Sequence, residues 1–388
     1  MVAKQPESTA RARAVDIARR ARETRLMTRF ATGFLVLALS ASGTAAERAT
    51  KNVVLVLVDG LRWQEVFSGA DQTLIEHEKG GVEDREALLG AYWREDAAAR
   101  RAALMPFLWS TVAREGQILG DRDAGSPSTV TNGLKFSYPG YSEMLVGFHD
   151  PRIDSNAKTP NPNVTVLEFL HGRPGFAGKV AAFGVWDVVP SIVNRERCGF
   201  FVNGGFEPVL VEPISKEQAL LNRLKSELPK QWQSMPPDAI AFHAMLEYTV
   251  AHAPRVLYFT FGETDEFAHE GRYDHYLDAA RRTDGFLREL WEKLQSIPSH
   301  RGTTTMIVAA DHGRGRGPDD WSKHNKDIEG AEEIWIAAIG PDTPPLGARS
   351  DAGPTTQSQI AATLAAALGE DWCAAEPRAA KPIAGLVR

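Results

Sequence analysis

The sequence predicts an α/β fold, a three-layer sandwich in which helices cover both faces of a mostly parallel central sheet. Three largely apolar runs, at residues 53–58, 256–261 and 303–310, are rich in β-branched and large apolar side chains. Such runs are typical of strands that are buried on both faces, as central parallel strands are. Helix-like stretches lie between them, which favours a doubly covered sheet.

The other elements follow from local patterns along the chain. Residues 84–115 are rich in Ala, Arg, Leu and Glu and predict a helix with a break near Pro106. Pro139 fits the first turn of a helix, which places Ser137 just before a helix amino terminus. The remaining expected elements are strands at 117–121, 179–185 and 333–339, helices at 164–170, 216–230, 239–253, 273–297 and 357–368, and a loop at 150–163.

The first 46 residues differ in composition from the rest of the 388-residue chain, whose 43% hydrophobic and 24% charged content is in the globular range. They carry eight Lys or Arg against three Asp or Glu, then a short apolar run and small residues that end at Ala46. This layout predicts a secretory signal at 1–46. A complete signal also follows Met27, which indicates Met27 as an alternative start of translation. The protein is therefore expected to be periplasmic or secreted, without a membrane span after signal removal.

Charge and cysteine content restrict the partners. The net charge of the whole chain is −6, and removal of the basic first 46 residues makes the remainder more acidic. Nucleic acid or anionic lipid is therefore not expected as the main partner. The only cysteines, Cys198 and Cys373, can form one disulfide or remain two half-buried thiols, and the oligomeric state is left open.

Acidic and imidazole side chains follow the apolar runs, at the strand edge where ligands collect in open α/β sheets. Asp59 ends the first run, and Asp311 with His312 ends the third. Asp265 and His269 follow the second run and are four residues apart, so one helical turn directs both the same way. Each of these residues alone is also compatible with a turn or a helix cap.

Together with the later His324, these positions make three carboxylates and three imidazoles, a natural ligand set for two divalent ions. Zn²⁺ is the best choice, because nitrogen ligands are prominent and Ca²⁺ or Mg²⁺ would require more oxygens. Ser137 lies where the free N–H groups of a helix would favour an anion such as phosphate, although its position alone favours a plain capping serine.

These blocks resemble the alkaline phosphatase superfamily, nearest to its nucleotide pyrophosphatase/phosphodiesterase-like branch. The similar blocks are VLVDG at Asp59, SYPGY at Ser137, DEFAH from Asp265 to His269, DHG at Asp311 and the single His324. The resemblance implies an alkaline phosphatase-like fold, with Ser137 as the nucleophile of a covalent phosphoseryl intermediate. It implies one Zn²⁺ held by Asp59, Asp311, His312 and Ser137, and a second held by Asp265, His269 and His324.

The chain departs from the family patterns in places. Ala268 replaces a glycine. Asn156 is the expected catalytic phosphate-binding residue, but its spacing from the nucleophile is not identical to the family pattern, and its position alone favours a loop-capping asparagine. Sulfatases carry an arginine where Tyr141 stands, and phosphoglycerate mutases usually have another metal set, so both are weaker alternatives. The side chains that could neutralise a phosphate are Lys135, Arg152, Lys158, Arg195 and Lys323.

The expected protein is thus an exported two-zinc hydrolase of small-molecule phosphate esters. Residues 47–388 are expected to form a single metallohydrolase domain, with a cap-like insertion around 186–250. A phosphomonoesterase would place Lys or Arg against the third free oxygen, whereas a phosphodiesterase would offer an apolar wall, such as Tyr138, Trp186 or Phe206. A catalytically silent metal-bearing binding protein is the alternative of another class.

Overall fold

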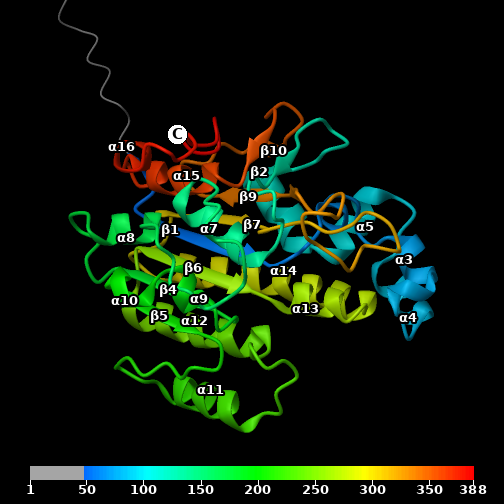
Figure 1. Cartoon of the computed structure of the whole chain (residues 1–388), viewed down its shortest axis with the longest axis horizontal. Coiled ribbons are helices and arrows are strands. Elements are labelled where there is room, and N and C mark those ends of the chain that lie inside the picture. The colour runs from blue at the N-terminus through cyan, green and yellow to red at the C-terminus, as the bar shows by residue number, and fades with distance from the viewer. Residues whose placement is uncertain (1–47) are drawn as a thin grey trace, which may run out of the picture. The chain divides into compact units, whose positions relative to one another are not determined.

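Strand β1 (Asn52–Val58) is buried along its whole length and lies inside the main sheet, which has eight strands in residues 48–388 (Figure 1). The structure is a computed structural model that describes residues 48–388, and these residues form one compact unit. The expected signal at 1–46 and the alternative start at Met27 lie outside the described residues. No helix in the described part of the chain has the length and apolar character that crossing a bilayer requires.

The strand order is β10-β2-β9-β7-β1-β6-β4-β5, and only β9 runs against its neighbours. The mostly parallel sheet expected from the sequence is confirmed. A second sheet of three short strands has the order β11-β3-β8. The bounds are β2 (Gly116–Leu119), β3 (Ser128–Thr129), β4 (Val180–Gly184), β5 (Phe201–Gly204), β6 (Val256–Phe261), β7 (Thr304–Ala309), β8 (Glu333–Ile334), β9 (Ile336–Ile339), β10 (Gly347–Ala348) and β11 (Thr355–Thr356).

The register of the three central strands creates one functional edge. Val58 at the end of β1 pairs with Phe261 at the end of β6, and Leu57 pairs with Ala309 at the end of β7. Because the three strands are parallel and end together, the residues that follow them emerge at the same edge. That edge carries Asp59 and Asp311.

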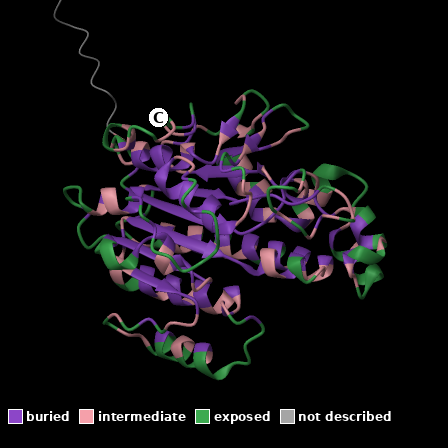
Figure 2. Ribbon diagram, in the orientation of Figure 1, coloured by how far each residue is buried: buried purple, intermediate pink, exposed green. Residues whose placement is uncertain are grey.

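Helices cover both faces of the sheet, as the predicted three-layer fold requires. On one face, Phe242 of α12 (Asp238–His252) stacks on Phe286 of α14 (Tyr273–Ser296) and packs against Phe259 and Phe261 of β6. Side chains alternate along a strand, so the intervening Thr260 faces the other side. Figure 2 shows the strands as a buried layer, with exposed residues on outer helices and loops.

The other helices pack around these layers. Helices α7, α8 and α15 contact one another, and α15 also contacts β1. The remaining bounds are α2 (Trp63–Ser68), α3 (Gln72–Glu76), η1 (Glu78–Gly80), α4 (Arg85–Tyr92), α5 (Ala97–Leu104), η2 (Leu108–Val112), α6 (Ala113–Glu115), α7 (Ser137–Val146), α8 (Val166–His171), α9 (Val189–Ile192), α10 (Arg195–Cys198), α11 (Lys216–Glu227), α13 (Glu263–His269), α15 (Gln359–Ala367) and α16 (Trp372–Ala375).

Two expected elements differ from the structure. The helix expected at 84–115 is divided into α4, α5, η2 and α6, and Asp96 starts α5 by accepting the Ala99 N–H. The strand expected at 333–339 is divided between β8 in the small sheet and β9 in the main sheet. Within the expected insertion at 186–250, β5 joins the main sheet and α12 covers it, so only the part around α11 lies outside these layers.

Candidate metal centre

The first group of ligand atoms lies at the ends of β1 and β7. The Nε2 atom of His312 is 3.3 Å from Asp59 Oδ1 and 3.4 Å from Asp311 Oδ2. One ligand atom from each of the three residues lies within 4.8 Å of the other two, and all three side chains are buried. The two carboxylates and the imidazole could therefore hold one divalent ion.

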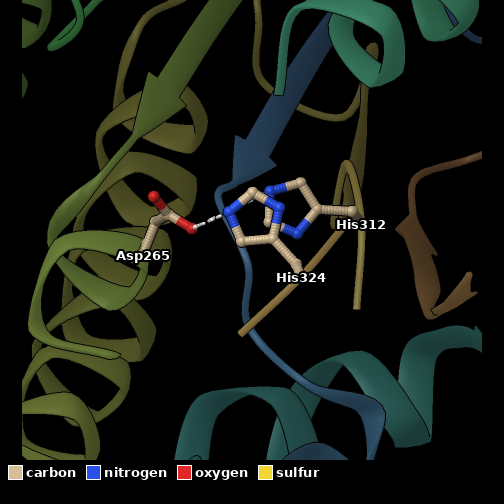
Figure 3. Close-up of side chains that lie close together, drawn as sticks. All are labelled: Asp265, His312 and His324. Atoms are coloured by element: carbon tan, nitrogen blue, oxygen red, sulfur yellow. Dashed lines mark ion pairs between the residues drawn. The ribbon is translucent and has the colours of Figure 1, made fainter. Parts of the chain in front are cut away.

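The second group shares His312 and adds Asp265 and His324 (Figure 3). Asp265 Oδ1 lies 3.6 Å from His324 Nε2 and 3.8 Å from His312 Nε2. The two imidazole rings stack with their centres 3.9 Å apart and their planes 14° from parallel. His324 is in the loop after β7, which has neither helix nor strand at this point, so only the folded chain brings it to the strand edge.

His269 is the outermost of the six expected acidic and imidazole ligands. Its Nε2 lies 3.1 Å from Asp265 Oδ2 and 3.0 Å from His324 Nε2, and 47% of its side chain is exposed. Helix α13 explains the contact with Asp265, because residues four apart lie on the same side of a helix. The structure thus places all six residues around one site, with His312 between the two ligand groups.

Hydrogen bonds set the orientation of the two inner imidazoles. The Nδ1–H of His312 donates to Gly313 O at 3.0 Å, and that of His324 donates to Lys135 O at 3.1 Å. This leaves the Nε2 lone pair of His312 near Asp59 and Asp311, and that of His324 near Asp265 and the His269 ring. An Nδ1–H bonded to a backbone carbonyl and a free Nε2 are the arrangement found in metal-ligating histidines.

Uncompensated polar atoms collect at the first group. Asp59 Oδ1, Asp311 Oδ2 and His312 Nε2 are buried and have no hydrogen-bond partner among the described residues. Burial and the neighbouring Asp265 carboxylate raise the pKa of Asp59, and burial and Asp59 raise that of Asp311. Buried like charges without partners are costly, and a divalent cation would satisfy all three atoms. The residues therefore fit a bound metal ion.

Arg314 adds a fixed positive charge beside the second group. Its fully buried guanidinium contacts Asp265 Oδ1 and also donates to Gly60 O at 3.1 Å and to Ser322 O at 2.7 Å. Although burial opposes the shift, this guanidinium and His269 hold the pKa of Asp265 well below its usual range. Sequence reasoning missed Arg314, although its place directly after the Asp311–Gly313 motif was an available signal.

Ser137 is the first residue of α7, whereas the sequence predicted it just before the helix. The residue is buried, with 5% of its surface exposed. Close packing brings this helix to the ligands. A Cβ atom at Gly140 would lie 2.6 Å from Asp311 O, so only glycine allows the approach. Tyr141 of the same helix donates its hydroxyl hydrogen to Asp59 Oδ2 at 2.9 Å, a role that its sequence position did not reveal.

Asn156 lies beside the start of α7. Its Oδ1 accepts the backbone N–H of Tyr138 at 3.0 Å, while its Nδ2 donates to no other described residue. The first turn of α7 otherwise offers few free donors, because Pro139 has no N–H and the N–H of Gly140 bonds to Phe136 O. Asn156 therefore occupies the Tyr138 N–H with its Oδ1 and offers its own Nδ2–H groups as donors at the start of α7.

A cavity of about 220 Å³ joins these residues. Its lining, within residues 48–388, contains no Lys or Arg and includes one of the three expected apolar walls, Trp186, with Met235 beside it. The complete lining is Asp59, Ser137, Asn156, Trp186, Met235, Gly262, Asp265, Glu266, His269 and His324.

The residues expected to neutralise phosphate lie elsewhere. Four of them form ion pairs with acidic residues outside the lining, and Lys323 is also outside it. The pairs are Lys135 with Glu332, Arg152 with Asp150, Lys158 with Asp187 and Arg195 with Glu207. Tyr138 donates to Thr159 O, and Phe206 lies under Lys230 Nζ, so neither forms the expected wall.

The chain belongs to the type I phosphodiesterase / nucleotide pyrophosphatase family, which matches residues 92–338. The match includes every expected site residue except Asp59. No curated protein matches the sequence.

Solved structures of the alkaline phosphatase superfamily share the fold, as the resemblance implied. The chain is similar to wild-type alkaline phosphatase PafA, with a TM-score of 0.55 and 11% identity over 87% of this chain and 99% of that one. It is also similar to the phosphonate monoester hydrolase SpPMH from Silicibacter pomeroyi, with a TM-score of 0.52 and 13% identity over 83% and 74% of the two chains. Because the sequence identities are only 11% and 13%, these similarities establish the fold alone.

Proposed function

We propose that this protein is a two-zinc phosphodiesterase that acts through Ser137. The observation that carries the proposal is the meeting of two ligand groups at His312, where three buried polar atoms have no partner among the described residues. Ser137 lines the same cavity as Asp59, Asp265 and His324 of these groups. This combination matches the chemistry of two-metal phosphate-ester hydrolases. It also agrees with the family to which the chain belongs.

Each ion is assigned to residues that the fold brings close. Asp59, Asp311 and His312 would hold one ion with the Ser137 hydroxyl as a further ligand, and Asp265, His269 and His324 would hold the second. When bound, the ions supply Lewis acidity, which lowers the pKa of a coordinated hydroxyl and stabilises charge on the leaving oxygen.

The covalent steps are assigned to Ser137. Its Oγ forms a bond to phosphorus as the bond from phosphorus to the leaving alcohol breaks, and its hydroxyl proton passes to solvent. The leaving alkoxide takes up a proton from water. A second water then attacks the phosphoserine, releases the phosphate product and restores the Ser137 hydroxyl.

Asn156 is assigned to phosphate binding. The Tyr138 N–H fixes its amide through Oδ1 at 3.0 Å, so Nδ2 can donate to a non-bridging oxygen of the phosphate. A donor held in this way stabilises charge that develops in the transition state without having to reorient.

The cavity favours a diester over a monoester. A diester carries one negative charge and a second organic group, whereas a monoester carries two charges and needs an additional cationic contact. None of the described lining residues is Lys or Arg, and Glu266 adds negative charge, while Trp186 and Met235 offer apolar surface to an organic group.

The test compares bis-nitrophenyl phosphate, nitrophenyl phosphate and nitrophenyl sulfate, with zinc measured in the same preparation. We expect two zinc ions per chain and the highest kcat/KM for the diester. Ser137→Ala should lower diester turnover by about 10³-fold or more while two zinc sites persist. A zinc-loaded protein without turnover would favour the silent binding protein, and preference for the sulfate would contradict the phosphodiesterase.

Export and the cap are proposed from the sequence. We infer that residues 1–46 are removed and that the mature protein is periplasmic or secreted, and we assign α11 and its flanking loops to a cap. Amino-terminal sequencing of the protein from a periplasmic or culture fraction tests export, and an intact amino terminus in the cytoplasm would contradict it. Deletion of the α11 segment should change KM for diesters if this segment is a cap.

A further inference from the structure

His324 is held by a backbone carbonyl whose position depends on an unusual conformation. Its Nδ1–H donates to Lys135 O at 3.1 Å, and Lys135 has a φ of +58° although it is not glycine. This left-handed region is unfavourable for a side chain with a Cβ, so the surrounding structure must stabilise it. The Lys135 side chain points elsewhere, with Nζ 2.8 Å from Glu332 and 3.2 Å from Ile328 O.

Asn132 stabilises this conformation. Its Oδ1 accepts the backbone N–H of Lys135 at 2.8 Å and that of Leu134 at 3.0 Å. These two bonds close a tight turn around Asn132, which is 3% exposed. Its Nδ2 donates to Glu143 Oε2 at 2.9 Å, so the amide itself has little freedom to rotate.

Glu143 connects the turn to the helix that begins with Ser137. Its buried carboxylate accepts the N–H groups of Thr131 and Asn132 at 2.9 to 3.0 Å, and the Ser358 hydroxyl at 2.6 Å. Glu143 lies in α7 six residues after Ser137. One hydrogen-bonded path therefore runs from the nucleophile's helix through Asn132 and the Lys135 backbone to the His324 ring.

We propose that Asn132 is a positioning residue for the His324 imidazole, that it acts through the left-handed backbone of Lys135, and that Glu143 anchors it to α7. This inference rests on the proposed function in that His324 is taken as a zinc ligand. Because His324 comes from a loop, its own element does not fix the ring. The path fixes the position of His324, a proposed ligand of the second ion, relative to Ser137. The part that Lys135 plays is to accept the His324 Nδ1–H through its carbonyl oxygen.

The test measures Zn²⁺ binding to the metal-free protein by competition with a chromophoric chelator. Asn132→Ala should weaken one of the two zinc sites about 10- to 100-fold, the usual effect of losing an outer-shell partner, and leave the other unchanged. Adding Lys135→Gly to Asn132→Ala should restore most of the affinity, since glycine adopts positive φ without strain. A merely structural role predicts the opposite, because glycine would loosen the loop further.

A matched pair at Lys135 supports the test if Asn132→Ala does not fold. Lys135→Gly and Lys135→Val remove the same charge, but only valine opposes the left-handed conformation, so only Lys135→Val should weaken the site. Asn161→Ala is the control for loss of a buried asparagine. Asn161 bonds to Ser142 Oγ of α7 and to Ile192 O, but it makes no hydrogen bond to Asn132, Lys135 or His324.

Two results would overturn the inference: unchanged zinc affinity in Asn132→Ala, or equal weakening by Lys135→Gly and Lys135→Val. Failure of the proposed function looks different, since it would appear in the unmodified protein as fewer than two zinc sites or as diester turnover that survives Ser137→Ala.

Discussion

The Arg314 guanidinium contacts the Asp265 carboxylate inside the ligand cluster, so one of the expected metal ligands already has a cationic partner. Arg314 is fully buried, and Asp265 is 14% exposed in its side chain. The guanidinium also donates to Gly60 O and Ser322 O, which ties the end of β1 to the loop before His324. The pair compensates one of the three carboxylates that meet at this edge.

Removal of Arg314 should destabilise the metal-free protein. Arg314→Met leaves Asp265 without its main cationic partner, and loss of one member of a buried pair typically lowers the free energy of unfolding by about 3–5 kcal/mol. Zn²⁺ would neutralise the same carboxylate, so the loss should be smaller with zinc bound. Urea unfolding with and without zinc measures the difference.

Arg282→Met is the control, because Arg282 pairs with Glu263 at 2.7 Å but contacts none of the expected ligands. It should cause a smaller loss that zinc does not change. Equal losses for Arg314→Met in the two conditions would show that Arg314 and zinc do not act on the same carboxylate.

Metal removal should abolish turnover and lower stability. The buried atoms of Asp59, Asp311 and His312 that have no partner among the described residues gain one when a metal ion binds. Because the unfolded chain does not form this site, the metal ion binds only the folded protein and raises its free energy of unfolding. At free zinc of about 100 times Kd, the gain should be about 2.7 kcal/mol per site. Thermal unfolding after dialysis against a chelator, then after stepwise zinc addition, tests this, and full activity without metal would refute it.

Asn156 should act on kcat more than on KM. Asn156→Ala removes a donor that is positioned for the phosphate, and loss of one such donor lowers kcat by about 10²- to 10³-fold. Asn156→Asp should be at least as damaging, because it brings a negative charge to the phosphate. Steady-state kinetics on the diester measures both variants, and an active Asn156→Asp enzyme would remove Asn156 from phosphate binding.

Lys225 should make stability depend on pH. Burial lowers its pKa from 10.5 to about 8, although Glu207 opposes the shift. Between these values the unfolded chain binds more protons than the folded chain, so the free energy of unfolding should rise with pH, by about 3 kcal/mol in all. Below about pH 8 both states are protonated and this dependence disappears.

Urea unfolding of the unmodified protein and of Lys225→Met across this pH range isolates the effect, because other titrating groups are common to both. The unmodified protein should show the steeper rise. Parallel pH profiles would mean that Lys225 keeps its ordinary pKa in the folded state.

Much of the fold was predictable because burial leaves a local pattern. The central strands β1, β6 and β7 lie within two residues of the expected runs, since strands buried on both faces must be apolar throughout. Polar residues directly after such runs stood out for the same reason. The division of 333–339 into β8 and β9 was not predictable, because short apolar runs do not reveal which sheet they join.

By itself, the sequence determined that acids and imidazoles follow three buried strands, because each strand and its first loop residues are adjacent in the chain. Only the tertiary structure decided which side chains share a position, since that depends on strand register and on loops from distant segments. It placed His312 between two ligand groups, set Arg314 against Asp265, and brought Lys135 O to His324. Asp265 and Arg314 are 49 positions apart, Lys135 and His324 are 189 apart, and Asp59 and His312 are 253 apart. No local pattern encodes contacts over such separations.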